Sequence, residues 1–173
     1  YDGLLAGQLD VALSRSLPAA APKYLGSLEI YSDRLLAYLP SGHPLAQKLV
    51  LSLTDFAGSP MVLFKRSGAP NLYDQIIHAC QEAGVSPWIA SEPNSMQAVL
   101  TEVASGLGAS IAPGCIRQLA MPGYLWRPLL EDCGGISFQL HYRTDEPEPA
   151  TTAFVKMVQD KRPEIRKTVA SPK

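Results

Sequence analysis

Short apolar runs alternate with helical patterns along this chain of 173 residues. Residues 9–13 and 61–64 predict buried strands, because each run is short, mostly apolar and followed by polar residues. Strands that alternate with helices are typical of an α/β protein. Six further strands are predicted at residues 25–31, 34–39, 88–91, 109–112, 124–129 and 138–142.

Two helices in the middle of the chain have clear start and stop signals. Asn71 is expected to cap the first helix, and Gly84 ends it because glycine tolerates the left-handed conformation. Asn94 or Ser95 is expected to cap the second helix, which ends at Gly106. Single helical turns are predicted at residues 43–46 and 53–56, where a proline or a short apolar pattern begins them.

A third helix is predicted at about residues 150–161. Phe154, Val155 and Val158 recur at helical spacing and should form its buried side. Residues 163–173 are expected to be a frayed basic tail.

Composition narrows the class of protein. Hydrophobic residues make up 46% and charged residues 18% of the chain, which indicates a globular domain. Fifteen basic residues nearly cancel sixteen acidic ones, so direct binding to DNA phosphates is not expected. The three cysteines lack metal-type spacing and favour reduced thiols in the cytoplasm. No apolar run is long enough to span a membrane.

Catalytic motifs are missing from the sequence, and we predict no catalytic residue, metal site or cofactor. The glycines at 106–108 follow a helix and precede a strand, whereas a dinucleotide fingerprint needs the reverse order. Cys80 lies on the apolar side of its helix and is expected in the core. The histidines are isolated in sequence and should make local hydrogen bonds or lie at the surface; they are His43, His78 and His141.

Polar residues gather where strands end and helices begin. Arg15 follows the first strand, Arg66 and Ser67 follow the strand at 61–64, and Ser95 opens a helix. Helix N-termini attract anions through their N–H groups, and an arginine fork binds carboxylates. The pattern predicts binding of a small anion. Two alternatives remain open: the helix-start residues act only as caps, and the two arginines form surface salt bridges.

Four segments together resemble the effector-binding domain of LysR-type transcriptional regulators. Leu-Leu-Ala-Gly-Gln-Leu-Asp-Val-Ala-Leu at residues 4–13 is similar to the family's L-x-x-G-x-L-D-x-A stretch. Residues 36–45 are similar to the family's strand and His-Pro-Leu turn. Residues 51–64 are similar to the family segment that follows this turn along the chain. Val-Ala-Ser-Gly-Leu-Gly-Ala-Ser-Ile-Ala-Pro at residues 103–113 resembles the fourth. The segments occur in the family's order and cover nearly the whole chain.

The resemblance implies a two-lobe α/β fold like that of type 2 periplasmic binding proteins, with two crossing strands and an effector in the cleft. The first lobe would comprise residues 1–32 and 137–173, and the second lobe residues 33–136. The family's first strand, helix and second strand come before the motif at residues 4–13. We therefore expect this chain to lack them and its first lobe to be incomplete.

Residues 64–73 look most like the subgroup that regulates the catabolism of aromatic compounds. That likeness implies an aromatic acid or a dicarboxylate as the effector. Arg15 and the turn at 70–72 match positions that line effector pockets, and Ser95 faces the cleft in the family pattern. The predicted ligand-binding residues are Arg15, Arg66, Ser67, Pro70, Asn71, Leu72 and Ser95.

The implied function is effector-controlled transcription by a cytoplasmic homo-oligomer, a dimer or a tetramer, that contacts DNA only through an N-terminal helix-turn-helix domain absent from these residues. No membrane contact is expected. The alternative is a solute-binding protein of a transport system with the same fold, which would need an export signal. An enzyme on this fold would need a reactive group in the cleft, and Lys65 at a strand end is better interpreted as a solvated loop lysine.

Overall fold

A computed structural model of the protein describes residues 1–15, 17, 21–145 and 148–170. The chain divides into two compact units, Tyr1–Asp33 with Ile136–Lys173 (unit 1) and Arg34–Gly135 (unit 2). Both units contain helices and strands, which confirms the predicted α/β class. Within the described residues, none of the helices combines the length and the apolar character that a membrane crossing requires.

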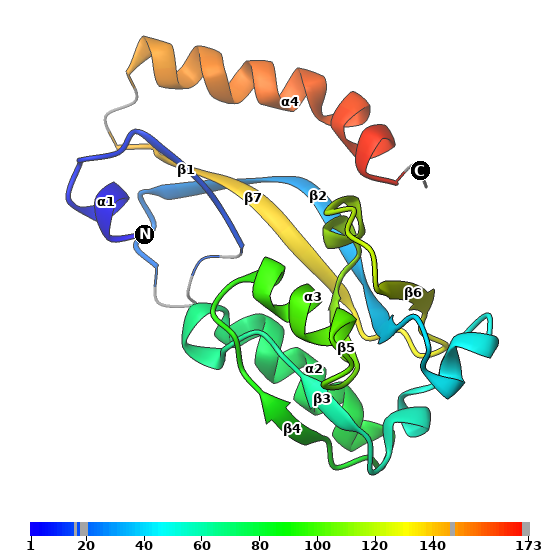
Figure 1. Ribbon diagram of the computed structural model, residues 1–173. Coiled ribbons are helices and arrows are strands. Elements are labelled where there is room, and N and C mark those ends of the chain that lie inside the picture. Colours follow the sequence, from blue (N-terminus) through cyan, green and yellow to red (C-terminus); the bar gives the residue numbers. More distant parts are fainter. Residues whose placement is uncertain (16, 18–20, 146–147, 171–173) are drawn as a thin grey trace. The chain divides into compact units, whose positions relative to one another are not determined.

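Unit 1 is a small sheet with one long helix beside it. Its strands β1 (Val11–Ser14), β7 (Gly135–Arg143) and the first part of β2 (Leu25–Pro40) lie in the order β1-β7-β2. Helix α4 (Pro149–Ala170) runs along these strands, and the short helix α1 (Asp2–Leu5) precedes β1 (Figure 1). Val158 of α4 packs with Ile30 and Leu140 in the core of this unit.

Helix α4 is longer than predicted. It continues through Pro163 to Ala170, so the expected frayed tail is wrong up to that residue, and residues 171–173 lie outside the described part. The extension is held by contacts with β2, since Arg162 and Arg166 donate hydrogen bonds to the carbonyl oxygens of Glu29 and Ile30, at 3.2 and 3.0 Å. These tertiary contacts outweigh the low helix propensity of a proline.

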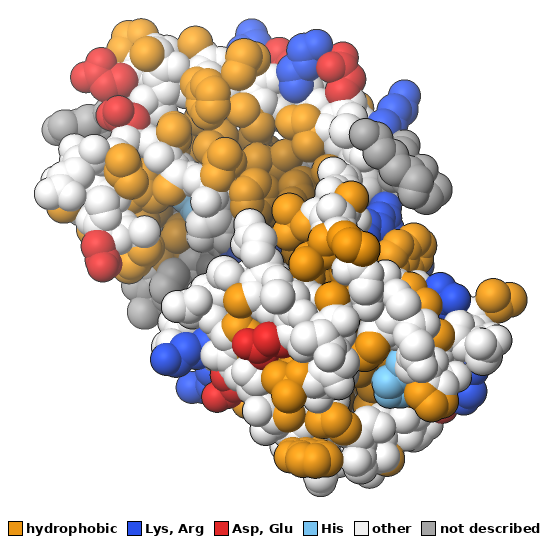
Figure 2. All heavy atoms as spheres, in the orientation of Figure 1, with side chains coloured by type: hydrophobic (Ala, Val, Ile, Leu, Met, Phe, Trp, Pro, Cys, Tyr) orange, Lys and Arg blue, Asp and Glu red, His pale blue; other side chains and the backbone are white. Residues whose placement is uncertain are grey.

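Unit 1 buries fewer apolar side chains than the sequence pattern predicts. The run at residues 9–13 is not a buried strand, because Leu9 and Leu13 are 47% and 56% exposed. β1 pairs only with β7 among the described strands, so its other edge is open. On α4, Val158 is buried as predicted, whereas Phe154 is exposed. Hydrophobic side chains accordingly gather on the visible face of this unit, along α4 and over the adjacent strands (Figure 2).

The chain passes from unit 1 to unit 2 within a single strand. Residues 25–31 and 34–39 were predicted as two strands, but β2 runs unbroken from Leu25 to Pro40. Ser32 and Asp33 therefore do not form a turn. Neither residue has the left-handed conformation and neither is a proline, so neither forces the chain out of an extended conformation.

Unit 2 is built around the second part of β2. This part lies between β5 (Ser110–Pro113) and β6 (Tyr124–Pro128), with Leu36 opposite Ala112 on one side and Pro128 on the other. A separate pair of parallel strands, β3 (Pro60–Val62) and β4 (Trp88–Ser91), completes the unit with helices α2 (Pro70–Glu82) and α3 (Met96–Ala104). Four short 3-10 turns lie at Pro44–Gln47, Leu53–Phe56, Arg66–Gly68 and Gly114–Gln118, the first two as predicted.

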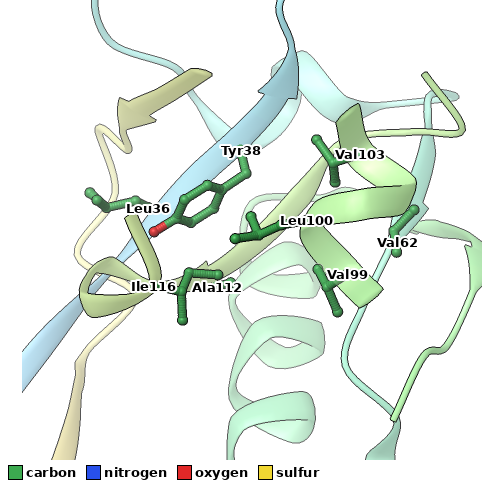
Figure 3. Close-up of a cluster of buried hydrophobic side chains, with 8 residues drawn as sticks. All are labelled: Leu36, Tyr38, Val62, Val99, Leu100, Val103, Ala112 and Ile116. Carbon is green, nitrogen blue, oxygen red and sulfur yellow. The ribbon is translucent and has the colours of Figure 1, made fainter. Parts of the chain in front are cut away.

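Helix α3 packs its apolar side onto β2 and β5 (Figure 3). Tyr38 is fully buried in this core, and its hydroxyl donates to the carbonyl oxygen of Pro113 at 2.9 Å, so the ring is buried without an unpaired polar atom. Burial of each such large side chain contributes about 1.5–3 kcal/mol to stability. The buried side chains of this cluster are Leu36, Tyr38, Val62, Val99, Leu100, Val103, Ala112 and Ile116.

Both central helices end as predicted, and α3 also begins as predicted, whereas α2 begins earlier than predicted. Gly84 and Gly106 follow the helices with φ of 74° and 88°, the left-handed conformation expected there. Ser95 caps α3, since its Oγ accepts from the Ala98 N–H at 3.1 Å. The prediction that Asn71 caps α2 is wrong, because Ala69 is the N-cap and Pro70 is the first helical residue. The proline ring fixes φ at a value that suits a first helical position, and the helix therefore begins two residues earlier than predicted.

Gly108 should be intolerant of any side chain. A Cβ at this position would clash with the backbone carbonyl oxygen of Pro60 and lie 2.8 Å from its carbonyl carbon. We expect Gly108→Ala to lower the free energy of unfolding by about 1–3 kcal/mol, because β3 and β5 would have to move apart. Urea denaturation measures this. Gly42→Ala is the matched control, since its Cβ would meet no atom within 4 Å and should change stability by less than about 0.5 kcal/mol.

The cap of α3 should contribute measurably to stability. Ser95→Ala removes the acceptor of the Ala98 N–H and should lower the free energy of unfolding by about 1 kcal/mol. Ser67→Ala, which removes an exposed hydroxyl, is the control in the same urea titration. Equal stability of the two variants would show that the cap contributes nothing.

Candidate functional site

Two loops lie together where the parallel strands of unit 2 end. β3 and β4 are paired in parallel, so their carboxyl ends meet at one edge. The Leu63 N–H donates to the Ser91 carbonyl oxygen at 3.1 Å, and the Lys65 N–H donates to the Pro93 carbonyl oxygen at 2.8 Å. These hydrogen bonds join the loop that leads into α2 to the loop that leads into α3. The carboxyl edge of parallel strands is where α/β folds bind ligands.

The start of α2 offers backbone donors. The first N–H with an acceptor in the helix is that of Tyr73, which donates to the Ala69 carbonyl oxygen at 3.1 Å. Pro70 has no N–H, which leaves the amides of Asn71 and Leu72 without an intrahelical acceptor. Their positive ends and the helix dipole favour a negative group at this position.

The start of α3 offers donors of the same kind. Ser95 accepts from the Ala98 N–H through its Oγ, and from the Val99 N–H through its carbonyl oxygen at 3.0 Å. A serine hydroxyl carries one hydrogen besides its lone pairs, so the capping Ser95 can still donate. The amides of Met96 and Gln97 precede the first intrahelical hydrogen bonds.

A tyrosine and a glutamate connect α2 to the loop after β4. Burial raises the pKa of Tyr73, and its hydrogen bond to the Glu92 carboxylate raises that pKa further. Tyr73 therefore stays protonated at neutral pH and donates to Glu92. This contact joins the first turn of α2 to the loop between β4 and α3. It also places one negative charge near the start of α2.

Neither Tyr73 nor Glu92 was among the predicted site residues. Glu92 could have been noticed as a charged residue that directly follows the predicted strand at 88–91. Its partner, nineteen positions earlier, carries no such signal in the sequence.

Arg66 faces a carboxylate of its own chain. Its Nε and Nη2 atoms lie 2.7 and 2.8 Å from the two carboxylate oxygens of Asp74, and both side chains are exposed. The hydrogen bond from Arg66 holds the pKa of Asp74 below its ordinary value. The surface ion pair that the sequence left open for Arg66 is thus present in the structure, while its role toward a ligand stays a prediction.

Arg15 belongs to unit 1, whereas the other predicted residues all belong to unit 2. It is half-buried, and its Nη1 donates to the Ile136 carbonyl oxygen at 3.5 Å. Its guanidinium carbon lies 5.7 Å from the centre of the Phe138 ring. In unit 2 the structure brings the segment containing Ser67, Pro70, Asn71 and Leu72 next to the loop that ends in Ser95.

The Cys80 thiol and the three histidine imidazoles differ in their surroundings. Cys80 is fully buried as predicted, and burial raises its pKa to about 11, so the thiolate is disfavoured. Among the described residues, no group of three or more His, Cys, Asp and Glu side chains is placed to hold a metal ion. Two histidines are placed as predicted, since His43 accepts from the Leu45 N–H and His78 is exposed beside Glu82. The prediction is wrong for His141, which is buried and hydrogen bonded to Ser27 and Arg15, both distant in sequence.

Comparison with known proteins identifies relatives over most of the chain. Residues 1–163 match the LysR substrate binding domain family. The uncharacterized HTH-type transcriptional regulator YnfL of Escherichia coli (strain K12) is 30% identical over 129 residues, which are 75% of this chain and 43% of that protein. The chain spans about half the length of the curated relatives it matches. These relatives are named as transcriptional regulators.

Solved structures with the same fold include two effector-binding domains. The effector binding domain of QuiR in complex with shikimate has a TM-score of 0.81 at 21% identity, covering 94% of this chain and 76% of that one. The BenM effector binding domain with its effector benzoate has a TM-score of 0.79 at 20% identity, covering 99% of this chain and 76% of that one.

This likeness confirms the predicted fold, which is that of type 2 periplasmic binding proteins. With the match over residues 1–163, it also confirms the predicted resemblance: the chain belongs to the LysR substrate-binding-domain family.

Proposed function

We propose that this chain senses a small carboxylate and that the starts of α2 and α3 bind it. The observation that carries the proposal is the hydrogen bonding between the segments that follow β3 and β4, one of which leads into α2 and the other into α3. Each helix start favours negative charge, so two neighbouring starts favour an anion more than one does.

A carboxylate suits the donors at this edge of unit 2. Its two oxygens accept hydrogen bonds in one plane, and the amides of Asn71 and Leu72 with the hydroxyl of Ser95 can supply them. A hydrogen bond to a charged group is stronger than one between neutral groups. Benzoate and shikimate, which the BenM and QuiR domains bind, are both carboxylates, and this supports the same chemical class here.

Two arginines are proposed to assist. Arg15 of unit 1 is proposed as one cation for the effector, because the residue is half-buried and its contacts to the Ile136 carbonyl oxygen, at 3.5 Å, and to the Phe138 ring leave its positive charge without a carboxylate partner among the contacts described above. Arg66 is ion-paired with Asp74 and would contribute to effector binding only to the extent that this ion pair opens. Ser67 and Pro70 complete the proposed lining, with Pro70 fixing the start of α2.

The effector in turn would control transcription. Related chains are named HTH-type regulators, and a net charge of −1 makes this chain itself a poor partner for DNA phosphates. We propose that DNA is bound by a helix-turn-helix domain elsewhere in the protein, within a dimer or tetramer. An aromatic acid or a dicarboxylate shifts the conformational equilibrium of the regulator only if it binds one conformation better than another.

Calorimetry of the full-length protein with benzoate, salicylate and cis,cis-muconate tests the ligand class, with benzamide as the uncharged comparison. We expect at least one carboxylate to bind and benzamide to bind at least tenfold more weakly, since the amide lacks the negative charge that the helix starts favour.

Arg15→Ala should weaken carboxylate binding about tenfold and leave benzamide binding unchanged. Ser95→Ala should weaken carboxylate binding about fivefold, whereas Ser105→Ala at the other end of α3 should have no effect. Equal affinity for benzoate and benzamide would contradict the proposal.

The ion pair at the start of α2 makes a second prediction. Asp74→Asn removes the partner of Arg66 and one negative charge near the helix start, so carboxylate affinity should rise roughly two- to fivefold at low salt. Glu82→Gln, at the far end of the same helix, is the control and should leave the affinity unchanged. If Asp74→Asn has no effect, Arg66 takes no part in binding.

A further inference from the structure

His141 is a buried side chain that the proposed function does not use. It lies on β7 of unit 1 and is only 1% exposed. One ring nitrogen, Nδ1, is 2.8 Å from the hydroxyl oxygen of Ser27 on β2. The other, Nε2, is 2.8 Å from the backbone carbonyl oxygen of Arg15. The imidazole therefore connects β2 to the residue that follows β1.

The direction of these hydrogen bonds follows from the groups involved. A carbonyl oxygen can only accept, so Nε2 carries a hydrogen and donates to Arg15. In the neutral ring Nδ1 then accepts from the Ser27 hydroxyl, and in the charged ring Nδ1 donates to the same oxygen. Both contacts are made in either protonation state, so the connection does not depend on the charge of the ring.

The backbone at Arg15 depends on this contact because the strand ends one residue earlier. The last residue of β1 that is paired with β7 is Ser14, opposite Gln139. At Arg15, side chains rather than a paired strand donate to the backbone carbonyl oxygen. The Ser14 hydroxyl donates to it at 3.1 Å, and His141 donates to it at 2.8 Å. A carbonyl oxygen has two lone pairs, and these two donors use both of them.

The Arg15 side chain makes weaker contacts than the Arg15 backbone does. Its hydrogen bond to the Ile136 carbonyl oxygen, at 3.5 Å, is at the long limit for such a contact, and the Phe138 ring lies 5.7 Å away. The hydrogen bonds to the Arg15 backbone therefore fix the point from which this loosely held side chain extends.

We propose that His141 is a positioning residue that fixes Arg15 for effector binding, an inference that rests on the proposed function of Arg15. His141 touches no effector in this scheme. It acts through the Arg15 backbone, with Ser27 holding the ring from the other side.

A double-mutant cycle on the full-length protein tests the proposal, read by calorimetry with the carboxylate that binds tightest among benzoate, salicylate and cis,cis-muconate. His141→Phe keeps a planar ring and removes both hydrogen bonds, and it should weaken binding about fivefold or more. The same change in an Arg15→Ala background should weaken binding by less than about twofold. His141→Gln retains a donor for the Arg15 carbonyl oxygen and should restore part of the affinity. An equal loss in both backgrounds would mean a purely structural role and would overturn the inference.

A second measurement covers the cases in which His141→Phe unfolds or the protein binds none of the three carboxylates. The NMR resonances of the Arg15 backbone amide and Nε–H report its position without any ligand, and Ser27→Ala perturbs the ring more gently than a change of His141. Shifted resonances and faster Nε–H exchange in Ser27→Ala support the positioning role, and unchanged resonances overturn it. Failure of all carboxylates to bind to the wild-type protein overturns the proposed function separately.

Discussion

The parallel pairing of β3 and β4 is the constraint on which the candidate site depends. Because the strands run in the same direction, the loops that lead into α2 and α3 both leave at one edge. The strands are only three and four residues long, and the pairing is extended by hydrogen bonds from Leu63 to Ser91 at the end of β4 and from Lys65 to Pro93 in the loop after it. The close approach of Gly108 to the backbone of Pro60 brings β5 against β3 on the other side.

Sequence patterns predicted most of the secondary structure of unit 2 because its elements have local start and stop signals. Ser95 as a cap, and Gly84 and Gly106 in the left-handed conformation, determine the ends of helices through contacts within a few residues. The predictions for unit 1 were less accurate. Nothing in the apolar pattern at residues 9–13 shows whether another element covers the strand, and nothing near Pro163 shows that β2 supports the helix beyond it.

The candidate site was predicted only in part, for the same physical reason. Positions at strand ends and helix starts follow from local sequence, and these include Asn71, Leu72 and Ser95. Contacts between distant residues do not follow from it. The bond between Tyr73 and Glu92, and the one between His141 and Arg15 across 126 positions, arise from the packing of separate elements. Arg66 and Asp74 are eight residues apart, but their pairing requires the turn at Arg66–Gly68.

The unbroken strand β2 has a consequence for sequence variation in this protein. From Leu35 to Leu39 every side chain is buried, because both faces of the strand are covered in unit 2, whereas Ser27 and Ser32 in the first part of the strand are exposed. The two halves of this strand should therefore tolerate different substitutions. Polar replacements should be tolerated at selected positions of its first half, whereas its last residues should accept only apolar side chains of similar size, so a mutational scan would show the tolerance profile change in mid-strand.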